Sequence, residues 1–374
     1  MEFQFGTGWA RFSETAGGVI GQTLAMEGVF AFFLESSFLY LLIYQEKKLG
    51  ALGHWGASLA MFCGTWLSGY FIVTTGAFMQ HPQGHLVLSS GKMVLGNMKD
   101  YLLNPWAIVQ YIHTMNGAVI TGTFCMASLS SYYLLQAQHV EFAKRSLKLS
   151  VLVGLIASLA AAFPTGDLQA KLVQQFQAPT FAAMEGLFKT EQSAGLVLIG
   201  QPNVETQTLD NPIRIPHILS FLTYHRWNSQ IKGLNEFEGA VPSQNIPPLY
   251  YTYHIMAGLG TLFILIMSAA TFLLWKQKLY RARGMLWILL LSVPFPFIAN
   301  NAGWVTAEIG RQPWIVYGLM RTADGYSQNV SAGNVWFTLL GFMGIYAMLS
   351  ILFLFLILRA IQKGPDPEPA TVLQ

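Results

Sequence analysis

The chain has 374 residues, of which 53% are hydrophobic and only 10% are charged. Soluble domains carry about 25% charged residues, so this composition excludes an ordinary soluble protein and indicates a polytopic membrane protein. The net charge is +3, and the cations gather in loops between apolar runs, which argues against nucleic acid as a partner. Cys63 and Cys125 both lie inside apolar runs, which argues against a disulfide framework or a cysteine metal site.

Seven apolar runs are long enough to cross a bilayer, which takes about 20 helical residues. We expect spanning helices at 19–44, 54–79, 105–136, 146–164, 247–275, 284–305 and 333–360. The fourth run is short, and Pro164 is expected to end it. The predicted fold class is an all-α integral membrane protein, a bundle of about seven transmembrane helices with one large external loop.

A polar, proline-containing segment separates the fourth run from the fifth. We expect it to form an extramembrane unit that is helical around Phe181–Thr190. The expected organisation is a four-helix membrane half at 1–164, an external loop at 165–246, a three-helix membrane half at 247–361 and a tail at 362–374.

Lysine and arginine cluster in alternate loops and therefore indicate an orientation. The cations of these loops are Lys47, Lys48, Lys144, Arg145, Lys148, Lys276, Lys278, Arg281, Arg283, Arg359 and Lys363. Cytoplasmic loops carry an excess of such residues, so this side is predicted to face the cytoplasm. The C-terminus is then cytoplasmic, whereas the N-terminus and segment 165–246 lie outside.

Two carboxyl groups lie within the first run, at Glu27 and Glu35. On a regular α-helix, residues eight apart lie within about 80° of each other around the axis. Two protonatable groups along one side favour a proton relay through the membrane. The alternative is a pair of neutral carboxylic acids that are hydrogen-bonded between helices.

A histidine and a methionine lie at matched depth on two runs. His113 follows Pro105 by eight residues and Met256 follows Pro247 by nine, which places both about 12–14 Å from those prolines. A His–Met pair can hold one haem iron from opposite faces. Both residues are also ordinary packing residues. His254 is a competing candidate, but it lies about 200° from Met256 around the helix.

The stretch Glu308-Ile-Gly-Arg-Gln-Pro-Trp314 ends the sixth run with an acid, a base and an indole. Trp304, Glu308 and Arg311 are spaced to share one helix face, and Pro313 is expected to end the helix. Ionisable groups at membrane depth are costly and mark a functional path or a bound group. We therefore expect a bound partner against this face.

Several motifs together resemble subunit I of the cytochrome bd quinol oxidases. They are Met1-Glu-Phe-Gln-Phe-Gly-Thr-Gly-Trp9, Glu27-Gly, Phe32-Phe-Leu-Glu-Ser36, Met79-Gln80, Ile112-His-Thr114, Ala143-Lys-Arg145, Gly166-Asp167, Gly233-Leu-x-Glu236, Ile255-Met256, Ala302-Gly-Trp304 and Gly310-Arg-Gln-Pro-Trp314. They follow the family's order over nearly the whole chain, so the resemblance is specific.

The resemblance implies a haem-bearing enzyme of the bacterial cytoplasmic membrane that oxidises quinol and reduces oxygen to water. It implies that His113 and Met256 bind a low-spin haem b, and that Glu308 is the axial ligand of a high-spin haem b. Trp304 and Arg311 would lie around the haems. A third haem, haem d, is left open.

The resemblance also implies how protons and quinol are handled. Glu27 would lie at the oxygen-reducing haem, and Glu35 would carry protons to it from the cytoplasm. Segment 165–246 would be the quinol-binding loop, with Glu236 in its motif. The implied partners are oxidase subunit II, a small single-helix subunit and membrane lipid.

The chain departs from the family pattern at several places. Met1 corresponds to a point late in the family's second helix, so the helix that carries the haem d histidine is expected to lie outside this sequence. His254 stands where members often have arginine, Gly76 where they have asparagine, and Asn235 where they have lysine. These changes suggest a divergent branch.

Two other functions stay open from the sequence. A shortened paralogue would carry a low-spin haem, or support a complete oxidase subunit, without reducing oxygen itself. A transporter would use Glu27, Glu35 and Glu308 as a proton path and would need no haem.

Overall fold

The computed structural model describes residues 8–365, and within them seven helical segments are long and apolar enough to cross a bilayer. These segments are Ala10–Tyr44, Glu46–Gln80, Met98–Leu135, Val140–Phe176, Ser243–Trp275, Arg283–Arg311 and Ala332–Lys363. They coincide with the seven runs expected from the sequence. The prediction of an all-α membrane bundle is therefore confirmed.

Several spans contain more than one helix, because irregular turns interrupt them. The helices are α1 (Ala10–Met26), α2 (Phe33–Tyr44), α3 (Glu46–Gln80), α4 (Met98–Leu102), α5 (Pro105–Leu135), α6 (Val140–Ala160), α7 (Asp167–Phe176), α8 (Ala178–Met184), α9 (Ile218–Tyr224), α10 (Ile246–Trp275), α11 (Arg283–Leu291), α12 (Pro294–Arg311) and α13 (Ala332–Lys363). Two π-helical segments, Glu27–Phe32 and Ala161–Gly166, join α1 to α2 and α6 to α7.

The fourth span does not end at Pro164, contrary to expectation. Pro164 lies inside the π-helical segment, and α7 continues the span to Phe176. Phe163 has extended angles (φ −137°, ψ 120°), the conformation that a residue before proline prefers. The proline therefore interrupts the helix without stopping it, and the predicted boundary at residues 164 and 165 falls inside a helical span.

The sixth span breaks once and ends where the sequence indicates. α11 ends at Leu291, and α12 begins at Pro294, where the missing N–H of proline costs no helical hydrogen bond. α12 ends at Arg311, and Gln312 is already extended (φ −61°, ψ 140°) ahead of Pro313. The prediction that Pro313 ends this helix is confirmed.

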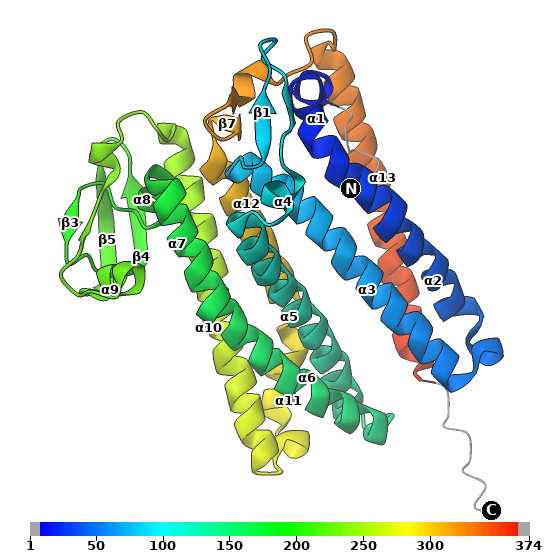
Figure 1. Ribbon diagram of the computed structural model, residues 1–374. Coiled ribbons are helices and arrows are strands. Elements are labelled where there is room, and N and C mark those ends of the chain that lie inside the picture. The colour runs from blue at the N-terminus through cyan, green and yellow to red at the C-terminus, as the bar shows by residue number, and fades with distance from the viewer. Residues whose placement is uncertain (1–7, 366–374) are drawn as a thin grey trace, which may run out of the picture.

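Residues 177–242 form a small mixed unit, here called the loop unit, at one end of the bundle (Figure 1). The strands of the chain are β1 (His85–Val87), β2 (Met93–Leu95), β3 (Glu191–Gln192), β4 (Leu196–Asn203), β5 (Thr208–Ile215), β6 (Gln230–Ile231), β7 (Trp314–Val316) and β8 (Met320–Arg321). In the loop unit β4 pairs antiparallel with β5, and β3 with β6. The expected helix at Phe181–Thr190 extends only to Met184, and strand structure begins at Glu191.

Four apolar clusters are buried among the described residues, and the two largest position the loop unit and the central helices. One joins α5, α6, α10 and α11, and there the rings of Phe124 and Phe263 lie 4.9 Å apart. The other packs the loop unit onto the bundle, with Phe181 and Leu187 buried against Trp106 and Leu249. The loop unit is therefore fastened to the ends of α5 and α10, and we call that end of the bundle the loop end.

Helix α13 lies at the edge of the bundle (Figure 1) and buries none of its residues. The Tyr133 hydroxyl of α5 donates a 2.8 Å hydrogen bond to the Ile361 carbonyl, which attaches its far end. An exposed apolar helix is expected where lipid or another subunit covers it. Residues 1–7 of the first motif and 366–374 of the tail lie outside the described residues.

Candidate functional site

The charge cluster at the end of α12 is a buried cation beside a half-exposed acid. Arg311 is 4% exposed and donates from Nη2 to Glu308 Oε2. Its Nη1 donates a 3.0 Å bond to the Ile315 carbonyl, while its buried Nε has no partner among the described residues. The structure thus brings Glu308 and Arg311 together, as their spacing predicts. A buried N–H donor is left for an anionic group.

The two tryptophans of this region, Trp304 and Trp314, differ in what covers their rings. Trp304 is 57% exposed on α12, so the described chain does not cover it. Trp314, in β7, has the Arg321 guanidinium 5.3 Å from its ring centroid, close enough for a cation–π contact. The open indole is therefore Trp304, one helical turn before Glu308.

His113 is held so that one ring nitrogen is free for a ligand. Its Nδ1 lies 3.2 Å from the Thr165 hydroxyl. That hydroxyl is itself 2.8 Å from the Ala160 carbonyl, which can only accept its proton. When the Thr165 proton goes to the Ala160 carbonyl, Nδ1 is the donor to Thr165, and the lone pair of Nε2 is then unprotonated. An orienting hydrogen bond on the second nitrogen is typical of metal-binding histidines.

Met256 lies on α10 directly beside a glycine of α12. A Cβ at Gly303 would come within 2.6 Å of the Met256 sulfur, so only glycine leaves room for the thioether there. The two helices that carry His113 and Met256 touch at Phe124 and Phe263, which lie further from the loop end. An imidazole nitrogen and a thioether sulfur are both donor atoms that can hold haem iron.

His254, the competing candidate, is engaged elsewhere. Its Nδ1 lies 2.9 Å from the Tyr250 carbonyl and its Nε2 lies 3.3 Å from the Val197 carbonyl. Its ring packs on Tyr250, with the centroids 3.9 Å apart. Both nitrogens thus face backbone oxygen, and the residue ties α10 to β4. This arrangement favours a structural role for His254.

Glu27 and Glu35 are not on one uninterrupted α-helix. Glu27 begins the π-helical segment that ends at Phe32, and Glu35 follows in α2. The wider π turn changes the angle per residue, so the expected 80° offset does not apply across it. Ser68 of α3 donates a 3.1 Å hydrogen bond to Glu27 Oε1. Both carboxyl groups are half-buried.

Glu236 lies at the surface of the loop unit. It ends the 3₁₀ turn Leu234–Glu236 and is exposed. Its Oε1 accepts a 3.2 Å hydrogen bond from the Thr190 hydroxyl, and Asn235 also accepts from the backbone of Thr190. The motif residue is thus at the rim of this unit and not in its core.

The structure adds one acidic residue that the sequence reasoning missed. Glu185, at the end of α8, is 2% exposed, and its Oε1 accepts a 2.7 Å hydrogen bond from the Tyr253 hydroxyl of α10. Its Oε2 has no partner among the described residues. Burial raises the pKa of the Glu185 carboxyl to about 7, against a smaller opposing effect of the Tyr253 hydrogen bond. The available signal was a carboxyl inside the apolar stretch 181–188.

A polar network fastens the loop unit to the charge cluster. Gln177 donates from Nε2 to the carbonyl (2.9 Å) and the side-chain Oε1 (3.0 Å) of Gln80. Gln80 in turn donates a 2.9 Å bond to the Ala307 carbonyl of α12. Thr180 of α8 donates a 2.7 Å bond to the Gly310 carbonyl. These hydrogen bonds therefore fix α8, which ends beside Glu185, relative to α12, which carries Glu308.

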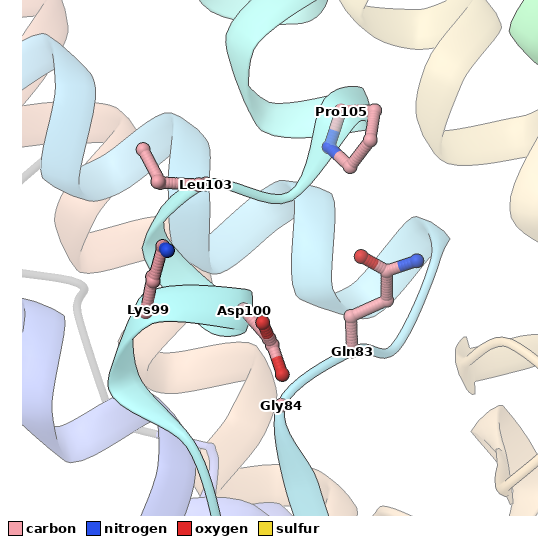
Figure 2. Close-up of a pocket in the computed structure, with 6 residues that line it drawn as sticks. All are labelled: Gln83, Gly84, Lys99, Asp100, Leu103 and Pro105. Atoms are coloured by element: carbon pink, nitrogen blue, oxygen red, sulfur yellow. The ribbon is translucent and has the colours of Figure 1, made fainter.

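A pocket of about 440 Å³ opens beside the loop between α3 and α5. Figure 2 shows its lining, which is Gln83, Gly84, Lys99, Asp100, Leu103 and Pro105. None of the expected site residues is among them. Its polar lining is unlike the mostly apolar wall of a typical cofactor pocket, so we do not place the site there.

Comparison with known proteins identifies the family. Residues 1–365 match the family model for cytochrome bd terminal oxidase subunit I. The cytochrome bd ubiquinol oxidase subunit 1 of Bacillus subtilis is 35% identical over 381 residues, covering 98% of this chain and 80% of the relative. The cytochrome bd-II ubiquinol oxidase subunit 1 of Escherichia coli is 26% identical over 434 residues, covering 98% and 84%.

A solved structure agrees with these sequence matches. The bd oxidase of Geobacillus thermodenitrificans superposes with a TM-score of 0.87 at 28% identity, covering 97% of this chain and 83% of that one. These matches leave the transporter alternative without support. The chain therefore belongs to the cytochrome bd terminal oxidase subunit I family, and it is a quinol:oxygen oxidoreductase subunit of the bacterial membrane whose family implies haem, quinol and a subunit II partner.

Proposed function

We propose that this chain holds the haems of its oxidase near the loop end and oxidises quinol beside the loop unit. His113 and Met256 would bind a low-spin haem b, and Glu308 would be the axial ligand of a high-spin haem b. Bound haem supplies electron transfer and oxygen-reducing chemistry, tuned by its axial ligands. Haem d remains a proposal for the third position.

The orientation of His113 is the observation that carries this proposal. Thr165 accepts from Nδ1 and so presents Nε2 as an unprotonated ligand. Gly303 leaves space at the Met256 sulfur on the neighbouring helix. Together these features leave the Nε2 of His113 and the sulfur of Met256 as the donor atoms for iron.

Arg311 would neutralise and orient the haem groups beside Glu308. Its cation already offsets the Glu308 carboxylate, and its buried Nε–H would serve a propionate. Trp304 offers an uncovered indole face one turn away on the same helix. These three side chains would make the α12 part of the haem site.

Protons for oxygen reduction would reach the haem site from the cytoplasm through Glu35 and then Glu27. The Ser68 hydroxyl orients Glu27 Oε1 from α3. Half-buried carboxyl groups at two depths of one span suit proton transfer in steps.

Quinol would bind against the loop unit, with Glu236 at the rim and Glu185 in the interior. Glu185 Oε2 is the buried oxygen that is free to accept a quinol proton, because Tyr253 occupies Oε1. A carboxyl group with a pKa near the working pH is suited to general base catalysis.

The loop unit and the N-terminus would face outside, and the C-terminus would face the cytoplasm. The opposite end of the bundle gathers the basic loops: the Tyr280 hydroxyl donates to the Lys144 carbonyl, and Tyr133 reaches Ile361. The proposed domain division stays that of the sequence: along the chain, membrane halves at 1–164 and 247–361 flank an external loop at 165–246. A small single-helix subunit is a further proposed partner.

The test is haem retention in the purified complex. His113→Ala should lose the low-spin haem b spectrum, because its Nε2 ligand is removed, while His54→Ala serves as the matched control at a membrane edge. Optical and pyridine-haemochrome spectra measure the haem content of both. An unchanged low-spin spectrum in a folded His113→Ala complex would contradict the proposed ligand.

A further inference from the structure

Two buried polar atoms without partners lie where the loop unit meets α10. They are Glu185 Oε2 and the Tyr250 hydroxyl, and neither has a hydrogen-bond partner among the described residues. The two residues are only 2% and 1% exposed. Buried polar atoms are almost always satisfied, by protein or by ordered water. Each of the two atoms is therefore expected to bind ordered water inside the junction.

Tyr250 crosses from the bundle helix to the sheet of the loop unit. A Cβ at Gly186, the residue after Glu185, would lie 2.9 Å from its ring. A Cβ at Gly200 of β4 would lie 3.0 Å from its hydroxyl oxygen. The ring also packs with Val197 and Leu209. The ring of Tyr250 thus lies against Gly186, next to Glu185 in the chain, and its hydroxyl lies at β4.

Charged groups continue this line to the surface. Val197, which packs against Tyr250, pairs with Arg214 across strands β4 and β5. Arg214 of β5 forms a 3.1 Å ion pair with Glu191 of β3, and both side chains are about one-third exposed. Tyr250 thus lies against the residue after the buried Glu185 and, through Val197, against the strand pair that carries the surface ion pair.

We infer that the Tyr250 hydroxyl and the Arg214–Glu191 pair form the route by which a quinol proton leaves Glu185 for the outer surface, with ordered water between Glu185 and Tyr250. This inference rests on the proposed role of Glu185 at the quinol site. Tyr250, Arg214 and Glu191 are then positioning and relay residues that do not touch quinol.

The proton balance is simple. Quinol loses two electrons, which the oxidase reaction passes to oxygen, and two protons. The two protons leave one after the other by the same route, and for each of them one quinol O–H bond breaks as a Glu185 Oε2–H bond forms. That bond then breaks, and its proton passes to water. The Tyr250 hydroxyl accepts this proton and at the same time gives up its own to solvent at the Arg214–Glu191 pair. Glu185 is then ionised again and can accept the next quinol proton.

The groups around this route are few. The Tyr253 hydroxyl donates to Glu185 Oε1, and the ring of Tyr250 lies against Gly186, the next residue in the chain. Tyr250 in turn contacts the rings of His254 and Tyr251. The raised pKa of Glu185, about 7 through burial, allows it to exchange protons near neutral pH.

The decisive variant is Tyr250→Phe, which removes only the hydroxyl and keeps the ring packing. The matched control is Tyr251→Phe, on the adjacent exposed tyrosine. Both are studied as the purified complete oxidase in vesicles with a pH-indicating dye outside. We expect Tyr250→Phe to retain haem and to slow quinol-driven proton release about tenfold, a barrier increase of the size that one lost relay group explains. Tyr251→Phe should match wild type.

A second readout and a second variant keep the test independent of turnover. Infrared difference spectra should show the Glu185 carboxyl remaining protonated for longer after quinol oxidation in Tyr250→Phe. Glu191→Gln, at the surface, should slow proton release without altering haem content, and it replaces Tyr250→Phe if that complex fails to assemble.

The outcomes separate this inference from the proposed function. If Glu185→Gln slows quinol oxidation while Tyr250→Phe and Glu191→Gln both behave as Tyr251→Phe does, the release route is wrong and the quinol site stands. If Glu185→Gln oxidises quinol as wild type does, the proposed role of Glu185 fails and the route fails with it.

Discussion

Glu185, at the C-terminal end of α8, is only 2% exposed. Only Tyr253 hydrogen-bonds to it among the described residues, and burial holds its pKa at about 7, above the ordinary 4.5. In the folded state the group therefore keeps its proton up to about pH 7, whereas in the unfolded chain it loses the proton near pH 4.5. Between these values the folded state binds more protons, so this group makes stability fall as pH rises.

Glu185→Gln should remove that pH dependence. The difference between the two pKa values corresponds to about 3 kcal/mol of stability lost by the wild type across the window. The glutamine variant should therefore unfold at a higher temperature than wild type at about pH 8, with a smaller difference at about pH 5. Thermal unfolding of the purified complex at both pH values measures this, with Glu236→Gln on the exposed rim as control. A variant less stable than wild type at the higher pH would contradict the assignment.

Helix α8 and the glutamine network fasten the loop unit to α12. Gln177 and Gln80 are 1% and 4% exposed, and their amide groups satisfy each other and the Ala307 carbonyl. Buried amides that lose a partner carry the full cost of desolvation. The position of Glu308 relative to the loop unit therefore depends on hydrogen bonds between residues far apart in the chain.

Gln177→Ala should loosen this attachment. It leaves two oxygens of Gln80 without their donor, at a cost of about 1–3 kcal/mol. We expect a lower unfolding temperature and faster proteolysis within residues 185–242. Gln175→Ala, on the exposed side of α7, should have little effect. Equal proteolysis rates for the two variants would show that the network does not hold the loop unit.

At the scale of the whole molecule, two opposite ends are distinguished by charge and by structure. The loop unit covers one end, and the basic loops after the first, third and fifth spans gather at the other. The positive-inside rule then gives one orientation in the membrane. Spans that expose almost all of their apolar side chains, such as α13, fit lipid or partner subunits around the bundle.

Single cysteines should report this orientation. In a background with Cys63→Ala and Cys125→Ala, Glu205→Cys lies in the exposed β4–β5 turn and Lys278→Cys in the exposed loop after α10. A membrane-impermeant maleimide should label Glu205→Cys in intact cells and Lys278→Cys only after the membrane is opened. The reverse pattern would overturn the proposed orientation.

The sequence by itself determined the all-α membrane class, the seven spans and the family. Hydrophobicity along a helix is a local property, so apolar runs could be read without any contact between them. His113, Met256 and Glu308 could be named because the motifs that contain them are short stretches of sequence. Their roles remain proposals. Pattern alone also identified Pro313 as the end of α12, because the restriction before proline is local.

The tertiary structure decided what depends on distant contacts. Glu185 became a buried acid because Tyr253, 68 residues away, packs against it. His113 has a free Nε2 because Thr165, 52 residues away, holds its Nδ1. Pro164 did not end its span because the packed helix continues through a π turn. Burial and hydrogen bonding between remote segments are properties of the folded chain, and no local pattern of residues encodes them.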